Sequence, residues 1–464
     1  MSAIERFDLV VVGAGPAGMA AAATASQQGL KTLVLDEQIR PGGQIYRNIG
    51  HTPISDRSIL GPDYYSGERL LTMLDRASVE QLQGATVWEV RDDNTLCFSV
   101  AGESRRVGFH KLLLATGAQE RPAPFPGWTL PGVMTCGAAQ ILLKTSSMVP
   151  NGPLVIVGSG PLFLLIACQL LRAGVEIDAL VDTTPSKNYM AALPEIAGAL
   201  RGWRYLLKGA KMLAEIRRYK VPMYSGVSEV HAKPDHAGNL GAVVIKHRGE
   251  EKLIPCRTLL SHQGVIPNTQ LGRAIGLEHI WDEVQLCWKP KLSETGMSSH
   301  PDIFVAGDSS GIGGAVVAEL QGQLVADAAA RAMDKLSMPV SQRKQLESQL
   351  HQQLAIRPFL DALYRPTETF IRPADETVVC RCEEITAGEI RGLVELGCSG
   401  PNQTKAFCRS GMGACQGRQC GTTVSALLAE AQGKAIPDVG YYNIRMPIKP
   451  LTLGELASLN PYSK

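Results

Sequence analysis

A strand, a glycine turn and a helix open this chain, and they constrain its fold more than any other stretch. Residues 7–36 read FDLVVVGAGPAGMAAAATASQQGLKTLVLD. An apolar run, Phe7–Val12, precedes a complete GxGxxG motif, and an alanine-rich helix and a second strand ending at Asp36 follow it. Gly13 allows the tight turn, Gly15 lets the backbone approach a pyrophosphate, and Gly18 lets the helix pack closely. The free N–H groups of the helix would bind the phosphates and Asp36 a ribose hydroxyl, so the stretch predicts a dinucleotide-binding unit rather than a chance glycine turn.

A second unit with the same pattern begins near residue 154. Leu154–Val157 predicts a strand, the sequence GSGP at residues 158–161 a turn, and the apolar residues after it a helix reaching about Arg172. Phe163 stands where the third glycine should be, and a bulky ring there would push the helix away from the strand and crowd a pyrophosphate. Two interpretations stay open: a nicotinamide cofactor site, or a Rossmann-type scaffold with a changed or empty site.

Composition excludes several other classes of protein. The 464 residues suffice for two or three domains, and 45% hydrophobic with 19% charged residues is ordinary for a soluble globular protein. A net charge of +2 predicts neither nucleic acid nor an anionic membrane as a partner. The uncharged stretch Thr145–Leu171 contains Pro150, Gly152 and Pro153, so we expect loop, strand and helix there and no membrane span. No secretory signal fits before Phe7, and 11 cysteines, an odd number, favour a reducing compartment.

Four cysteines near the C-terminus form two close pairs. Cys380 and Cys382 are followed by 32 residues and then by Cys415 and Cys420. Glycines before Cys415 would free backbone N–H groups to bond sulfur, and the helix predicted from Thr422 onward would stabilise an anionic cluster with its N-terminus. Four thiolates suit an iron–sulfur cluster and also a tetrahedral zinc site, so both remain open.

The remaining cysteines indicate packing rather than chemistry. Cys136 has no second cysteine within four residues, which disfavours a redox disulfide and favours a buried small hydrophobe. Cys408 lies near the close pairs, but its spacing does not fit them, so we expect it to be structural.

Three motifs in order carry a family resemblance over roughly residues 5–335: the first fingerprint with Asp36, the sequence ATG at residues 115–117, and Phe304–Asp308. This order resembles the two-dinucleotide-domain flavoproteins related to thioredoxin reductase and glutathione reductase. The resemblance implies that the fingerprint binds the ADP half of FAD, that the ATG turn crosses between the nucleotide domains, and that Asp308 holds the ribityl chain. The implied FAD-binding residues are Gly13, Gly15, Pro16, Ala17, Gly18, Asp36, Glu37, Gly43, Gln44, Thr116, Gly117, Gly307 and Asp308.

The cysteine module resembles the bacterioferritin-associated-ferredoxin-like (BFD-like) [2Fe–2S] domain in its CQGxxC variant, which implies Cys380, Cys382, Cys415 and Cys420 as ligands. The order of modules and the closing stretch GYYNIRMPIKPLTLGE, residues 440–455, resemble the α (A) subunits of hetero-oligomeric FAD-dependent amino-acid and opine dehydrogenases. That group includes the A subunit of opine oxidase, the B subunit of hydrogen cyanide synthase, and the α subunits of D-hydroxyproline and proline dehydrogenases. The implied fold is α/β, with two Rossmann-like dinucleotide-binding domains and a small helical C-terminal domain.

This resemblance implies an electron-transfer subunit of a larger complex. A separate β-type FAD-containing subunit would oxidise the C–N bond of an amino acid or opine, and this chain would pass the electrons to quinone or a similar acceptor. Some members carry FMN at a subunit interface and a further small subunit, and the implied location is cytoplasmic, with peripheral attachment to the inner membrane as the alternative. The chain shows no cluster of acid–base residues, which is compatible with a flavin performing the hydride chemistry.

Two other hypotheses remain. A self-contained reductase would take a hydride from NAD(P)H at the second unit and feed its own [2Fe–2S] cluster. A non-enzymatic scaffold would hold ADP or ATP and bind zinc through the cysteines.

The predicted organisation has five parts, and three regions carry specific expectations. Residues 227–246 and 252–260 should form a three-stranded meander, and residues 358–373 an irregular connection. The basic helical segment Lys187–Lys220 should be a solvated face or a docking surface for another subunit. The predicted parts are an FAD domain at 1–122 and 261–335, a second dinucleotide-binding-like domain at 123–260, a linker at 336–374, the [2Fe–2S] domain at 375–435 and a tail at 436–464.

Overall fold

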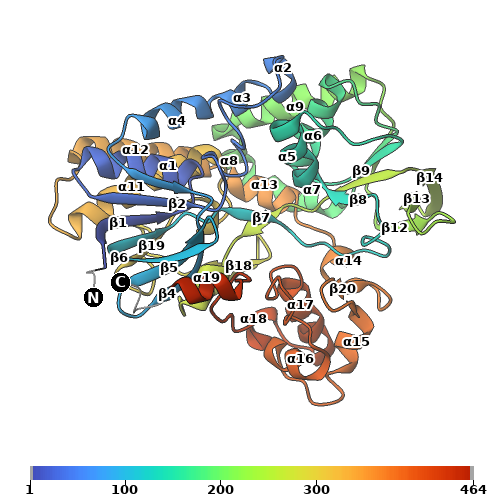
Figure 1. The fold of residues 1–464 in the computed structure, drawn as a ribbon. Coiled ribbons are helices and arrows are strands. Elements are labelled where there is room, and N and C mark those ends of the chain that lie inside the picture. Colours follow the sequence, from blue (N-terminus) through green and yellow to red (C-terminus); the bar gives the residue numbers. More distant parts are fainter. Residues whose placement is uncertain (1–3, 460–464) are drawn as a thin grey trace.

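The computed structural model describes residues 4–459 as two sheet-based units side by side, with a small helical module beneath them (Figure 1). The α/β architecture predicted from the two fingerprints is therefore confirmed. Across residues 4–459 no helix has both the length and the apolar character that a membrane span requires.

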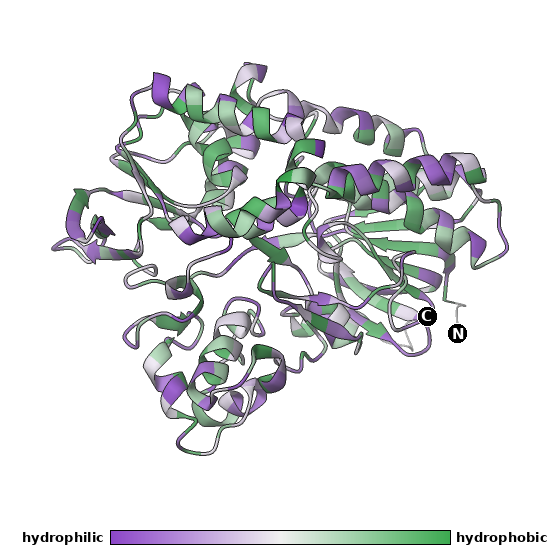
Figure 2. Ribbon diagram, turned by 180° about the vertical axis from the view of Figure 1, so that it is seen from behind, coloured by the Kyte–Doolittle hydropathy of each residue, from purple (hydrophilic) through white to green (hydrophobic). Residues whose placement is uncertain are grey.

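The first sheet is built on the opening fingerprint. Its strand order is β3-β2-β1-β6-β5-β4, and β19 also pairs with β6. The pairs β1–β2, β1–β6, β2–β3 and β6–β19 are parallel, while β4, β5 and β6 form an antiparallel extension. The strands are β1 (Arg6–Val12), β2 (Thr32–Asp36), β3 (Glu80–Gln83), β4 (Thr86–Arg91), β5 (Thr95–Val100), β6 (Glu103–Leu114) and β19 (Ile303–Val305). The strands at the centre of this sheet are largely hydrophobic, as strands covered on both faces must be (Figure 2).

Small residues bring two helices close together above this sheet. Helices α1 (Pro16–Gln27) and α11 (Ala315–Arg331) pack side by side (Figure 1). A Cβ atom on Gly322 would lie 2.2 Å from the carbonyl oxygen of Ala17, so only glycine fits at this crossing. The remaining helices of this unit are α2 (Arg57–Leu60), α3 (Pro62–Tyr65), α4 (Gly67–Asp75) and η2 (Gly307–Ser309).

The second sheet is entirely parallel, in the order β11-β10-β9-β15-β8. Its strands are β8 (Val133–Thr135), β9 (Leu154–Gly158), β10 (Ala179–Asp182), β11 (Met223–Ser225) and β15 (Thr258–His262). Its helices are α5 (Cys136–Ser146), α6 (Pro161–Arg172), α7 (Ser186–Ala192), η1 (Leu193–Glu195), α8 (Ile196–Arg201) and α9 (Trp203–Arg218). The uncharged stretch from Thr145 thus becomes the end of a helix, a loop, a buried strand and a helix, as predicted.

The meander prediction was partly wrong. The three antiparallel strands are β12 (Glu229–Pro234), β13 (Leu240–His247) and β14 (Glu250–Pro255), whereas the later part of residues 252–260 enters the parallel sheet as β15. Strand β14 is mostly exposed and β15 almost entirely buried. Residues 252–260 therefore contribute to two different sheets, and their hydrophobicity alone does not show where one strand ends and the next begins.

Two-stranded ribbons and short helices connect these units. They are β7 (Ala118–Glu120) with β16 (Val265–Pro267), β17 (His279–Asp282) with β18 (Cys287–Pro290), and helix α10 (Gln270–Ala274). The linker contains α12 (Val340–Leu354), α13 (Arg357–Leu363) and α14 (Glu368–Ile371). The expectation that residues 358–373 are irregular was wrong, because Pro358 occupies the first turn of α13, where proline favours a helix.

The C-terminal module lies below the ribbons in Figure 1 and contains β20 (Val378–Cys380), β21 (Ile385–Thr386), α15 (Ala387–Gly392), α16 (Pro401–Cys408), α17 (Gly421–Gln432) and α18 (Ile436–Val439). The chain then returns to the first sheet, ending with α19 (Leu453–Ser458). The backbone N–H of Ile448 donates to the carbonyl oxygen of Trp88 at 3.0 Å, and Lys449 pairs with Glu37 at 2.7 Å. The tail thus ties the C-terminal module to the first sheet.

Candidate functional site

Close backbone contacts explain the glycines of the first turn. Gly13 has φ of +106°, and a Cβ atom there would lie 2.4 Å from the carbonyl oxygen of Ala115. A Cβ atom on Gly18 would lie 1.8 Å from the carbonyl oxygen of Gly13. Gly15 is the N-cap of α1 and no side chain caps it, so the first N–H groups of the helix face outward for a ligand. This cradle fits the pyrophosphate of a dinucleotide.

The other predicted FAD-binding segments converge on this turn. A Cβ atom on Gly43 would lie 2.8 Å from the Cα of Gly15, and one on Gly307 would lie 2.9 Å from the Cβ of Ala17. Gln44 follows in the same loop. On the crossing strand, the Thr116 hydroxyl donates to the carbonyl oxygen of Asn268 at 3.1 Å, and Gly117 accepts from the N–H of Asn268 at 2.9 Å. Segments far apart in sequence therefore surround the N-terminus of α1.

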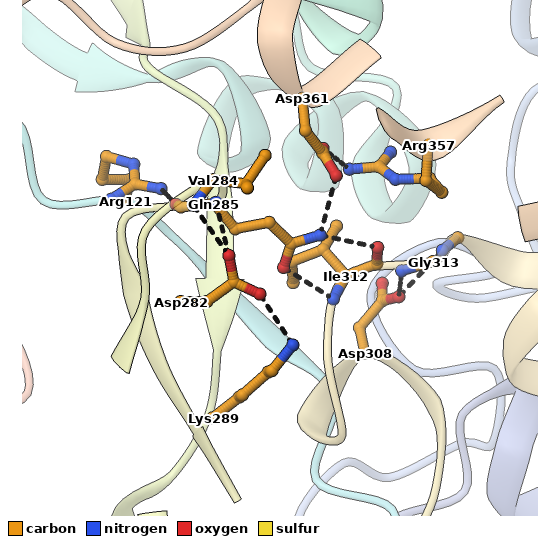
Figure 3. A network of polar contacts seen from close by, with 11 residues as sticks. Arg121, Asp282, Val284, Gln285, Lys289, Asp308, Ile312, Gly313, Arg357 and Asp361 are labelled. Atoms are coloured by element: carbon orange, nitrogen blue, oxygen red, sulfur yellow. Dashed lines mark hydrogen bonds and ion pairs between the residues drawn. The ribbon is translucent and has the colours of Figure 1, made fainter. Parts of the chain in front are cut away.

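The three predicted acids have different partners. The Asp36 carboxylate accepts from the N–H groups of Ala14 at 2.5 Å and Gln38 at 2.7 Å, and burial raises its pKa despite these bonds. Burial, the largest single effect, acts in the same direction on Glu37, but the ion pair with Lys449 and the charges of Arg418 and Arg47 together leave its pKa lowered. Asp308 accepts hydrogen bonds from the N–H groups of Gly313 and Gly314, each at 2.9 Å (Figure 3). These bonds hold the loop that leads into α11, whose N-cap is Gly314.

Sequence reasoning also missed Arg47 at this site. Arg47 follows the Gly43 loop and lies close enough to Asp36 and Glu37 for their charges to raise its pKa, although burial has the larger effect and lowers it. Within the described chain, its Nε–H finds no hydrogen-bond partner. A partly buried guanidinium with an unpaired, buried Nε–H suits an anionic phosphate, and its place in a loop after the second strand was the available signal.

The turn of the second unit differs from that of the first. Gly160 has φ of +93° where Gly15 has −75°, and the N–H of Leu164 lies 3.4 Å from the carbonyl oxygen of Gly160. Phe163 is 1% exposed and belongs to the hydrophobic core around Ile156. The predicted crowding of a pyrophosphate by this ring is therefore not borne out; the ring packs inside, and the turn above it has changed shape.

The C-terminal cysteines meet in two pairs. Cys380 and Cys420, each 1% exposed, are hydrogen-bonded, and this bond is the main cause that lowers the pKa of Cys380 to about 5. The N–H groups of Gly411 and Glu383 and the hydroxyl of Ser410 also bond the Cys380 sulfur, against the effect of burial. The same pairing raises the pKa of Cys420 well above its usual value. Such N–H groups stabilise anionic sulfur.

Cys382 and Cys415 form the other pair. A Cβ atom on Gly413 would lie 2.2 Å from the Cβ of Cys382, and one on Gly411 would lie 2.5 Å from the Cζ of Tyr442, so glycines permit this packing. Over residues 4–459, no three His, Cys, Asp or Glu side chains are arranged as a metal site. The four thiols with their N–H donors nevertheless form a chemically suitable donor set for a four-thiolate centre.

The thiols of two other cysteines make different contacts. Cys408 donates to the carbonyl oxygen of Thr404 at 3.4 Å, as expected of a structural residue. Cys136 is fully buried at the start of α5, which confirms the prediction of packing.

The loop Cys415–Cys420 contacts the crossing ribbon between the two sheets. The side-chain amide of Gln119 in β7 donates to the carbonyl oxygen of Arg418 at 2.9 Å, and that of Gln270 to Gln416 at 2.7 Å. The guanidinium of Arg273 lies 4.2 Å from the centroid of the Tyr441 ring. A small cavity lies at this junction, lined in part by both glutamines and Arg418. The cysteine loop is thus held against Gln119, which lies only three residues after the predicted FAD-binding residue Thr116.

Two further polar groups escaped the sequence analysis. Glu120 and His262 are both largely buried, with Oε1 and Nδ1 2.7 Å apart, and the other carboxylate oxygen accepts from the N–H of Gly137 at 2.9 Å. Gln285 donates to the carbonyl oxygen of Ile312 at 3.2 Å and to Asp361 at 3.1 Å, and so links the Asp308 loop to α13 (Figure 3). No local pattern marks these partners, because they lie far apart in sequence.

Two family models match the chain. Residues 7–322 match the pyridine nucleotide-disulphide oxidoreductase model, which supports FAD as a cofactor, and residues 374–459 match the sarcosine oxidase A3 domain. The second description names no iron–sulfur cluster, so the BFD-like assignment stays a prediction. The first match covers both sheet units, and the second covers the C-terminal module and its tail.

Curated relatives extend the match to nearly the whole chain. The A subunit of opine oxidase from Agrobacterium tumefaciens (strain Ach5) is 44% identical, covering 98% of this chain and 92% of its own length. Hydrogen cyanide synthase subunit HcnB of Pseudomonas aeruginosa is 33% identical, covering 97% and 98%. L-proline dehydrogenase from P. horikoshii has the same fold, with a TM-score of 0.72 at 17% identity over 98% of this chain and 81% of that one. The chain therefore belongs to the pyridine nucleotide-disulphide oxidoreductase family, within the group that contains HcnB and the A subunit of opine oxidase, and is a subunit of a flavin-dependent oxidoreductase.

Proposed function

We propose that this chain is the electron-relay subunit of a hetero-oligomeric amino-acid or opine dehydrogenase. FAD would be held by the predicted fingerprint residues and Arg47, and a [2Fe–2S] cluster by Cys380, Cys382, Cys415 and Cys420. When bound, a flavin accepts an electron pair and a cluster of this type carries single electrons. The observation that supports the proposal best is the pair of amide–carbonyl hydrogen bonds from Gln119 and Gln270 to the Cys415–Cys420 loop.

The residues of this chain would bind, orient and insulate the two carriers. The open N-terminus of α1 would bind the pyrophosphate, and Asp308, itself oriented by Gly313 and Gly314, would hold the ribityl chain. The N–H groups around Cys380 would stabilise thiolate charge, and the buried ring of Tyr442 shields one side of the loop. We assign these residues no acid–base role on a substrate and place substrate oxidation in another chain.

The names of the relatives support the proposal that this chain works with a partner subunit. The matched opine oxidase and hydrogen cyanide synthase proteins are named as subunits. So is the alpha subunit of sarcosine oxidase from Rhizobium meliloti, which is 26% identical over 97% of this chain and 42% of its own length. By this likeness, a β-type FAD-containing subunit would oxidise a CH–NH or CH–NH₂ bond. A further small subunit, FMN at an interface, quinone as acceptor, and a cytoplasmic location with peripheral attachment to the inner membrane belong to the same proposal.

The second candidate is a self-contained NAD(P)H-dependent reductase. The observation in its favour is the complete second sheet, with a glycine turn between β9 and α6 and Asp182 at the end of β10. Its altered turn at Gly160 weighs against it, since the backbone no longer repeats the geometry of the first site.

Cofactor analysis of the purified chain, with and without its co-purified partner, tests the proposal. We expect one FAD, two irons and two acid-labile sulfides per chain, no zinc, and oxidation of an opine, glycine or D-hydroxyproline only when the partner is present. Full amino-acid oxidation by the chain alone would overturn the relay assignment. Rapid anaerobic flavin bleaching by NADH or NADPH would favour the reductase, and a colourless preparation with stoichiometric zinc would favour a scaffold.

A further inference from the structure

Tyr364, at the end of α13, covers the glycine turn of the second nucleotide unit. The position that a Cβ atom would occupy on Gly160 lies 3.8 Å from Cγ and 3.9 Å from Cβ of Tyr364. Gly160 is the second glycine of the motif, the one over which a pyrophosphate normally approaches the backbone. A side chain in van der Waals contact with this point stands where the pyrophosphate would lie.

The charge of the acid that ends β10 also acts on Tyr364. Asp182 ends β10 and so corresponds to Asp36 of the first unit. Burial, followed by the nearby charges of Asp182 and Tyr189, raises the pKa of Tyr364 to about 12. Asp182 is therefore near enough for its charge to act on the Tyr364 phenol, and the carboxyl ends of such strands border the crevice in which a nucleotide of this fold binds.

The backbone around Tyr364 is fastened on both sides. Asn188 in α7 is 4% exposed, and its side-chain amide donates to the carbonyl oxygens of Leu363 at 3.1 Å and Arg365 at 2.8 Å. Arg365 in turn donates to the carbonyl oxygen of Glu283 at 2.6 Å. A buried amide that binds the carbonyls on either side of one residue fixes that residue, because releasing it would leave buried polar groups unpaired.

The helix before Tyr364 is anchored as well. Asp361 pairs with Arg357 and accepts from Gln285, whose amide also contacts Ile312 in the Asp308 loop (Figure 3). The position of Tyr364 is thus tied to both nucleotide units rather than to a free linker.

We propose that Tyr364 closes the second nucleotide site to NADH and NADPH and is a specificity-determining residue of this subunit. The ring takes the pyrophosphate position, and Asn188 holds it there. Electrons then cannot enter from a pyridine dinucleotide at this unit. This inference rests on the proposed relay function for its biological role. The binding of NADH and NADPH can be measured whether or not the chain is a relay subunit.

Nucleotide binding to the full chain, together with its partner where the two co-purify, tests this inference. NADH and NADPH are the probes, followed by calorimetry and by anaerobic bleaching of the flavin. Wild type should bind with a dissociation constant above about 1 mM, and Tyr364→Ala should bind at least about tenfold more tightly. Tyr364→Phe keeps the ring and should behave as wild type. Asn188→Ala, which releases the backbone without touching the crevice, should give an intermediate gain.

Two outcomes would overturn the inference: micromolar binding of NADH by wild type, or unchanged binding by both Tyr364→Ala and Asn188→Ala in preparations that retain full FAD. Partner-dependent reduction by substrate is measured in the same preparations. Failure of the relay function would appear there as loss of partner dependence, whereas failure of this inference would appear only in the nucleotide titrations.

Discussion

The amide nitrogen of Gln119 lies 2.9 Å from the carbonyl oxygen of Arg418 and donates a hydrogen bond to it. Gln119 follows the turn that crosses between the two nucleotide units, and Arg418 lies between Cys415 and Cys420. The contact joins residues 299 positions apart in sequence. It brings the proposed cluster loop to the edge of the flavin unit, which is the arrangement that a short electron path requires.

Weakening this contact should slow electron transfer without removing either cofactor. Replacing both Gln119 and Gln270 by leucine leaves two carbonyls of the loop without donors, at a cost of about 1–3 kcal/mol each. We expect FAD and iron contents to stay unchanged and the rate of cluster reduction, measured by stopped-flow absorbance, to fall by about tenfold. Gln432→Leu removes a similar amide–carbonyl contact inside the module and should leave the rate unchanged. An unaltered rate of cluster reduction in the double variant would show that these two hydrogen bonds do not contribute to electron transfer.

The first glycine turn should not tolerate a methyl group. Gly18→Ala would place Cβ 1.8 Å from the carbonyl oxygen of Gly13, so α1 must move away from the strand. We expect FAD content after purification to fall by about tenfold or more and the free energy of unfolding by about 1–3 kcal/mol. Gly209→Ala in α9, where a new Cβ atom meets nothing within 4 Å, is the matched control and should gain up to about 1 kcal/mol. Full FAD retention by Gly18→Ala would contradict the proposed cradle.

Serine substitutions should divide the C-terminal cysteines into two classes. Cys380→Ser, Cys382→Ser, Cys415→Ser and Cys420→Ser should each lower iron and labile sulfide by at least about half, because each removes one of four thiolates. Cys398→Ser and Cys408→Ser should retain both, since these thiols bond the carbonyl oxygens of Gly400 and Thr404 instead. Iron loss on Cys408→Ser with retention on Cys415→Ser would show that the ligand set is wrongly assigned.

His279 should make the protein less stable in acid. Burial, followed by the charge of Arg273, lowers its pKa to about 4 from 6.5. Between these values the unfolded chain binds the proton and the folded chain does not, so stability falls as pH drops from 6.5 to 4, by at most about 3 kcal/mol. His279→Asn, whose amide can replace Nδ1–H toward Leu277, should flatten urea-unfolding free energies over this interval. His236→Asn on the exposed loop is the matched control, and an equal flattening there would exclude His279 as the cause.

The elements that sequence predicted well are those whose causes are local. The first strand, turn and helix were expected at Phe7–Val12 and Ala17–Gln28 and form at Arg6–Val12 and Pro16–Gln27, because glycine spacing and alanine packing act within one βαβ unit. The α/β class is confirmed by the structure, and the family by the matching models and relatives. The predicted domain boundaries and site residues stay predictions.

The features that sequence missed depend on partners far away in the chain. Gln119 and Arg418, Glu120 and His262, and Tyr364 above Gly160 meet only because two sheets and a linker fold together. Phe163 shows the same limit. The sequence predicted that its ring would crowd a pyrophosphate, but packing places the ring in the core, and Tyr364 lies above the turn instead.

Freeze-quench EPR on the anaerobic complex tests the relay most directly. Substrate is added to the chain with its partner, to the chain alone, and to the complex carrying Cys415→Ser. The account predicts the signal of a reduced [2Fe–2S] cluster only in the complete wild-type complex, appearing within the time of one turnover. Undiminished substrate oxidation with quinone as acceptor by the Cys415→Ser complex, or cluster reduction by substrate in the chain alone, would contradict it.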